Sequence, residues 1–159
     1  MSASLPSPER STGCASTATM TIQASRKEAA SHCAGRPHPP SDDFANAENH
    51  FDATSGTAYG SNVAATLYPD ESTVERGSIW WLWTAPANGI ATFDTHGSNF
   101  DTQIGVYTGD AVDALAEVAF YDEYLTASVT FTATAGTVYR IVVGGSYARG
   151  SIHLNWSIQ

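Results

Sequence analysis

The chain has 159 residues, which is one domain's worth of sequence and enough to form a substantial hydrophobic core. Its net charge of −9 is uneven: residues 1–40 hold four basic and two acidic side chains, a balance of +2, whereas residues 41–159 hold three arginines and fourteen acidic side chains, a balance of −11. Phosphate backbones repel an acidic domain, and no apolar run is long enough to cross a bilayer, so the sequence predicts neither a nucleic-acid partner nor a membrane span.

Residues 1–40 predict a disordered or irregular N-terminal arm. They show neither strand nor helix periodicity, contain few large apolar side chains and end in a proline cluster at 36–40 that is typical of a linker. Cys14 and Cys33 both lie in this arm, where they either pair or stay reduced, and the rest of the chain has no cysteine. The arm also lacks the apolar run of a secretory signal peptide, so the export route stays open.

From residue 41 onward we expect a folded unit. Ser41 is placed to cap a short helical turn over 42–48. Beyond Thr54, alternating apolar and polar side chains are separated by clusters of Gly, Asn, Asp and Ser, which is the pattern of short strands joined by turns. The expected strands are 54–59, 62–68, 78–84, 89–95, 102–107, 115–121, 127–134, 138–144 and 150–158.

The spacing of these strands predicts the fold class. No long helix fits between them, which excludes a parallel α/β sheet. Short strands at this spacing, with turns between them, favour two packed antiparallel sheets. The sequence therefore predicts an all-β fold: a jelly-roll-like antiparallel β-sandwich of about 8–9 strands over 41–159, preceded by the disordered N-terminal arm.

The segment 78–86 holds three of the four tryptophans. Side chains alternate across a strand, so Trp81 and Trp83 share one face, which we expect to be core. Trp80 and Leu82 share the opposite face, with Trp80 as the more peripheral ring. This second face is either an exposed apolar surface that binds a protein or polysaccharide ligand, or a surface buried under the second sheet or a covering loop.

Five motifs in chain order resemble the bacterial pre-peptidase C-terminal (PPC) domain family, over about residues 41–158. The matching segments are 42–47, 64–66, 78–86, 97–102 with 106–109, and 129–131 with 135–139. The resemblance implies a jelly-roll-like sandwich that is attached to secreted proteases or other exported proteins and is not itself catalytic. It also implies an extracellular or cell-surface location and, from distant collagen-binding relatives, ordering by calcium. The chain departs from the family pattern at Asn99 and at 121–123.

A cluster of carboxylates is the candidate metal site. If 102–107 and 115–121 form a hairpin, residue 102 lies near residue 121, and the carboxylates that flank the two strands meet at one end. Calcium takes six to eight hard oxygen ligands of this kind. The alternative is that these side chains are solvated turn residues that cap their own backbone. The candidate ligands are Asp101, Asp122 and Glu123 from the hairpin, with Asp42 and Asp43 from the N-terminal turn.

The sequence contains no motif of a known catalytic apparatus. The histidines are not at the spacing of a zinc-binding helix, and no Gly-x-Ser-x-Gly elbow occurs. We therefore predict that the protein is not an enzyme but a non-catalytic extracellular accessory or binding module of the PPC type, with calcium as its candidate stabilising ion. The alternative is a structural or adhesive subunit that self-assembles through strand edges and the N-terminal arm.

Overall fold

The computed structural model describes residues 39, 41–47, 50–66, 76–122 and 126–159. The predicted arm over 1–40, Pro39 apart, and the candidate ligand Glu123 lie outside the described residues. The described part contains no helix long and apolar enough to cross a membrane. Its elements are the 3-10 turns η1 (Phe44–Asn46) and η2 (Val112–Ala114) and the strands β1 (His50–Phe51), β2 (Ser55–Ser61), β3 (Arg76–Thr84), β4 (Gly89–Asp94), β5 (Thr102–Thr108), β6 (Ala116–Tyr121), β7 (Ser128–Ala133), β8 (Val138–Gly145) and β9 (Ser151–Ile158).

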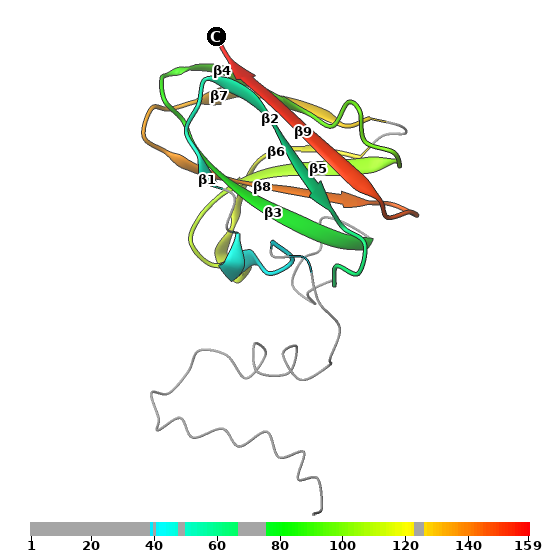
Figure 1. The fold of residues 1–159 in the computed structure, drawn as a ribbon. Helices are drawn as coiled ribbons and strands as arrows, with labels where there is room; N and C mark the ends of the chain where they lie inside the picture. Colours follow the sequence, from blue (N-terminus) through cyan, green and yellow to red (C-terminus); the bar gives the residue numbers. More distant parts are fainter. Residues whose placement is uncertain (1–38, 40, 48–49, 67–75, 123–125) are drawn as a thin grey trace, which may run out of the picture. The chain divides into compact units, whose positions relative to one another are not determined.

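The strands form two packed sheets (Figure 1). The five-stranded sheet has the order β1-β3-β8-β5-β6, and the four-stranded sheet has the order β2-β9-β4-β7. Without the short β1, these are the two interleaved four-strand orders of a jelly roll. Neighbouring strands are antiparallel except for β1 and β3, which are parallel. The predicted fold class is confirmed.

Aromatic rings fill the core between the sheets. Trp81 and Trp83 of β3 are fully buried, as the alternation predicts. The Trp83 ring packs edge-on against Phe93 of β4, with 5.2 Å between ring centroids, and lies tilted against Tyr139 of β8 at 5.7 Å. Rings from both sheets therefore contact one another directly, and separating the sheets would expose all of them to water.

Glycines let β2 lie close to the core. A Cβ atom at Gly56 would be 2.6 Å from the Trp156 ring, and one at Gly60 would be 2.9 Å from the Trp81 ring. Just before β2, the Ala53 carbonyl accepts a hydrogen bond from the Trp156 indole N–H at 3.0 Å. These contacts hold β2 against the sandwich through its inner face, although β9 is the only strand that it pairs with in the described residues.

The strand expected over 62–68 is wrong. The Asn62 side chain is buried, where it accepts the Gly150 backbone N–H at 2.8 Å and donates to the Gly77 carbonyl at 3.1 Å. A turn follows, in which Ala64 has a φ of 69°. The chain therefore bends at Asn62 instead of extending, because this amide connects the end of β2 to β3 of the other sheet and to the turn before β9. The last two residues of the expected strand lie outside the described residues.

The expected helical turn after residue 41 is present as η1, but no side-chain hydrogen bond caps it. Ser41 is instead buried, and its carbonyl accepts the Trp80 backbone N–H at 2.9 Å. The segment that leads into η1 is therefore fixed against β3 by a backbone bond. Strand β1 was not expected, since two residues carry no readable alternation.

Candidate functional site

Of the two alternatives for the Trp80 face, an exposed surface is wrong for Trp80 itself. Its side chain is only 1% exposed, although it faces away from the main core. Phe44 of η1 meets the Trp80 ring edge-on, with 5.1 Å between centroids, and Ala47 and Val142 pack into the same cluster. Because the segment 41–47 covers the outer face of β3 here, Trp80 belongs to a second, smaller core and not to an exposed surface.

Leu82 is half-buried against the same second core. On the neighbouring strand β8, the guanidinium carbon of Arg140 lies 4.1 Å from the centre of the Phe44 ring. Its Nη2 atom is 3.5 Å from the carboxylate of Asp110. The Trp80 and Leu82 face is therefore covered by an aromatic ring that is itself in contact with a cation, which matches the covering-loop alternative.

The two candidate metal ligands of the β5–β6 hairpin lie in a different register from the one expected. The structure pairs Ile104 with Tyr121, two residues along from the expected pairing. Gln103 therefore lies across from Asp122, and its Nε2 donates to Asp122 Oδ1 at 2.7 Å. Asp101 does not face Asp122 as the predicted register required, and the Asp122 carboxylate accepts hydrogen bonds from the Gln103 amide and, at 3.4 Å, from the Ser146 hydroxyl.

Asp42 and Asp43 lie in the segment that leads into η1. The buried Asp42 carboxylate accepts two hydrogen bonds from Thr66, one from its backbone N–H at 2.6 Å and one from its Oγ1 at 2.9 Å. Among the described residues, no group of three or more His, Cys, Asp or Glu side chains could hold a metal ion. Since Glu123 is not among them, calcium binding stays a prediction.

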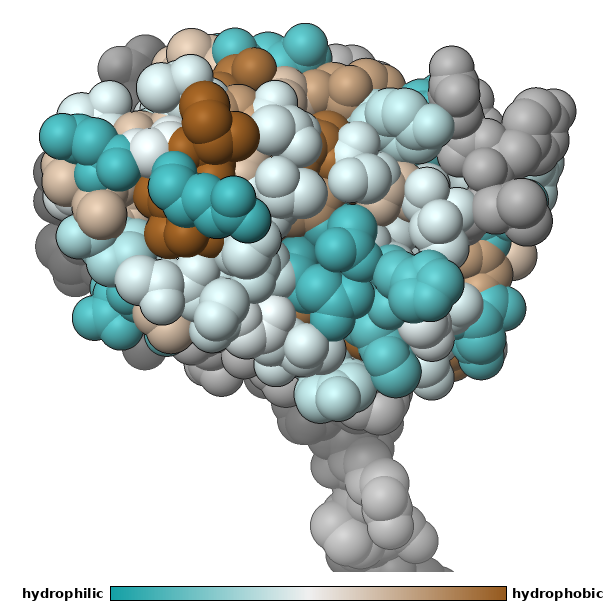
Figure 2. Space-filling view, turned by 90° about the horizontal axis from the view of Figure 1, so that it is seen from above, coloured by the Kyte–Doolittle hydropathy of each residue, from teal (hydrophilic) through white to brown (hydrophobic). Residues whose placement is uncertain are grey.

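The outer face of the four-stranded sheet is polar along β2 and β9, whereas β4 of the same sheet carries the exposed Ile90. Its side chains on β2 and β9 are exposed or half-buried. Figure 2 views the molecule from above, the side on which Figure 1 draws these strands, and the surface there is mostly pale or teal, with a distinct brown patch toward the left. The outward residues of these two strands are Ser55, Thr57, Tyr59 and Ser61 on β2 and Ser151, His153, Asn155 and Ser157 on β9.

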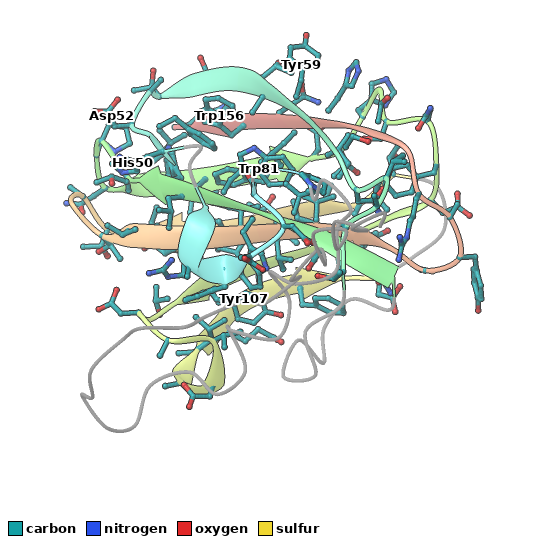
Figure 3. The ribbon with its side chains drawn as sticks, turned by 60° about the horizontal axis from the view of Figure 1, so that its bottom comes forward. His50, Asp52, Tyr59, Trp81, Tyr107 and Trp156 are labelled. Carbon is teal, nitrogen blue, oxygen red and sulfur yellow. The ribbon has the colours of Figure 1, made fainter. Side chains whose placement is uncertain are left out.

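Five side chains on this face form what we call the Tyr59 cluster. The Tyr59 side chain is 69% exposed and meets the His153 ring edge-on, with 4.8 Å between centroids. Figure 3 shows Tyr59 pointing away from the ribbon, whereas Trp81 and Trp156 lie between the sheets. An aromatic ring is therefore presented to solvent from a fixed strand. The cluster consists of Tyr59, Thr57, His153, Asn155 and Asp94.

The polar members of the cluster hold one another in place. Thr57 Oγ1 donates to Asn155 Oδ1 at 2.8 Å. Asn155 Nδ2 in turn donates to Asp94 Oδ1 at 2.8 Å and to the His96 carbonyl at 3.0 Å. The result is a hydrogen-bonded row across three strands beside an exposed ring. Such a row can offer hydroxyl, amide and carboxylate groups to a ligand that lies on the ring.

A tight turn supports His153. At Gly97 the chain has a φ of 99°, and a Cβ atom there would lie 2.7 Å from His153 Nδ1. The next residue, Ser98, accepts the His153 backbone N–H on its Oγ at 3.0 Å. Only glycine combines this backbone conformation with the close approach of the imidazole, so the turn sets where the ring lies.

Sequence reasoning selected the Trp80 face and not the Tyr59 cluster. The alternation within 55–61 and 151–158 identifies which side chains share a face of each strand. It does not show that these two strands, almost at opposite ends of the folded unit, lie side by side. Their pairing follows from the jelly-roll topology, in which the first and last long strands are neighbours.

No protein-family model matches this sequence, and no curated protein is significantly similar to it.

Proposed function

We propose that residues 41–159 form a non-catalytic, extracellular binding module of the PPC type, and that it binds its ligand through the Tyr59 cluster. The observation that carries the proposal is the exposed Tyr59 ring, which lies beside a hydrogen-bonded polar row on the outer face of the sheet. Tyrosine provides a large contact area with few rotatable bonds and a polar tip, which suits it to surface recognition.

The ordered motifs that resemble the PPC family support the family part of the proposal, and the jelly-roll strand order is the one that this resemblance implies. Export to the cell surface or beyond follows from the same resemblance. The accessory role does too, since PPC domains accompany other exported proteins.

We propose a neutral polysaccharide as the ligand class. Sugar rings combine apolar C–H faces, which pack on an aromatic ring, with hydroxyls that both donate and accept hydrogen bonds. The cluster offers an exposed ring beside hydroxyl, amide and carboxylate groups. The balance of −11 over residues 41–159 disfavours anionic chains.

A glycan array followed by titration calorimetry tests the proposal. Tyr59→Ala should weaken binding by about 2 kcal/mol, roughly thirtyfold in Kd, if this ring is the anchor. Tyr147→Ala is the matched control, because Tyr147 is a tyrosine of similar exposure, 74%, that lies in the turn after β8. Equal losses in the two variants, or binding only to a protein array, would contradict the polysaccharide assignment.

A further inference from the structure

The four edges of the two sheets differ in how they are protected. In the five-stranded sheet, β1 is only two residues long. The other edge of that sheet, β6, lies beside β7, the edge of the four-stranded sheet, so these two edges shield each other. The remaining edge, β2, has seven residues, most of which are exposed. Among the described strands it is the long edge that no other strand shields.

The register shows which backbone groups of β2 point outward. The Ile158 N–H donates to the Thr54 carbonyl at 2.9 Å, and the Asn62 N–H donates to the Gly150 carbonyl at 3.3 Å. Hydrogen-bonded pairs alternate along an antiparallel ladder, so the even-numbered residues between these two bonds direct their N–H and C=O groups toward β9. The odd-numbered residues direct theirs away from the sheet. They are Ser55, Thr57, Tyr59 and Ser61.

Strand β2 carries none of the usual devices that prevent strand addition. Protected edges contain charged side chains, proline or a bulge. The sequence of β2 is Ser-Gly-Thr-Ala-Tyr-Gly-Ser, without charge or proline, and its register with β9 runs unbroken from Ser55 to Ser61. The indole rings of Trp156 and Trp81 explain why β2 has glycine at positions 56 and 60. They do not explain why the outward residues of β2 carry no charge.

The same seven residues are nearly palindromic. Read from either end, the order is Ser, Gly, then Thr or Tyr, with Ala58 in the centre. A twofold axis through Ala58 would place Ser55 opposite Ser61 and Thr57 opposite Tyr59 of a second copy. These are the residues whose backbone groups point outward, so every one of them would gain a hydrogen-bonded partner. Thr and Tyr also form a favourable cross-strand pair of β-branched and aromatic side chains.

We infer that β2 pairs in antiparallel fashion with β2 of a second copy of this chain, which joins two four-stranded sheets into one continuous sheet. The symmetric contact is self-complementary, as a closed dimer requires. No charge lies in the strand itself, so the opposing term is the long-range repulsion between two chains of −9 each, which salt screens. Dimerisation should therefore strengthen as salt concentration rises.

The test is the mass of the full chain in solution, measured by light scattering and sedimentation across a range of concentrations, with a reductant present so that cysteines cannot link chains. The wild type should approach twice the mass of one 16.8 kDa chain as concentration rises. A monomer at every concentration, up to millimolar, overturns the inference. Thr57 and Tyr59 belong to both proposed surfaces, so the mass is measured without ligand, and a monomer that still binds polysaccharide would overturn the strand pairing but not the proposed function.

A pair of charged variants tests the register. Thr57→Lys with Tyr59→Lys places like charges opposite each other across the twofold axis, and so does Thr57→Glu with Tyr59→Glu. Each double variant alone should be monomeric, and an equal mixture of the two should restore the dimer. The control is Ser128→Lys with Thr132→Lys, exposed positions on β7, which should leave the dimer intact. Charged variants that still dimerise on their own, with unchanged circular dichroism, also overturn the inference.

Discussion

The two sheets treat their outer faces in opposite ways. On the five-stranded sheet the outward side chains include Trp80, Leu82 and Val142, and the segment 41–47 covers them. On the four-stranded sheet the outward side chains of β2 and β9 are Ser, Thr, Tyr, His and Asn, and they are exposed or half-buried. Alternation thus identifies an inner and an outer face in every strand. Whether the outer face is covered by another segment or stays exposed depends on whether its side chains are apolar or polar.

The largest expected effect breaks the covered face. Trp80→Ala should lower the free energy of unfolding by about 3–5 kcal/mol, because it leaves a cavity beneath Phe44. On the open face, Tyr59→Ala should change it by no more than about 0.5 kcal/mol. Denaturant titration of both variants measures the contrast. Similar losses of unfolding free energy in Trp80→Ala and Tyr59→Ala would contradict the distinction between a covered and an open face.

Calcium gives the next largest effect if the predicted site exists. Among its five candidate ligands, the Asp42 carboxylate accepts hydrogen bonds from Thr66, and the Asp122 carboxylate accepts one from Gln103. Binding to the folded state alone adds about 2.7 kcal/mol at a hundredfold excess over Kd. The melting temperature should then rise with Ca²⁺, less so with Mg²⁺, and the rise should vanish in Asp122→Asn. Identical melting curves in Ca²⁺ and in EDTA would leave these carboxylates as hydrogen-bond acceptors.

A smaller effect tests how the cover is attached. Asp42→Ala removes both acceptors of Thr66 and should cost about 1–3 kcal/mol, since a partly buried N–H and hydroxyl lose their partner. Asp42→Asn keeps one oxygen and should cost less. Asp52→Ala serves as the control, because Asp52 is exposed. Thermal melts of the three variants rank these costs, and an Asp52 variant as unstable as Asp42→Ala would contradict the assignment.

The sequence predicted the sandwich because the evidence for it is local. The alternation in β7, β8 and β9 and the burial of Trp81 and Trp83 depend only on strand geometry and apolar content. Its errors have other causes. The burial of Trp80 and the bend at Asn62 depend on partners distant in the chain. The register of the β5–β6 hairpin depends on the shift between Val106 and Tyr107, which alternation does not show. The Tyr59 cluster likewise needs the neighbouring positions of β2 and β9, which no local pattern contains.

The burial of every tryptophan makes the folded unit its own optical reporter. Trp80, Trp81, Trp83 and Trp156 are all buried, and residues 1–40 contain no tryptophan. Native emission should therefore be blue-shifted and poorly quenched by acrylamide, and unfolding should shift it to the red without interference from the N-terminal segment. Since Trp80 alone lies under the 41–47 segment, its replacement by phenylalanine would show whether that cover opens before the main core melts.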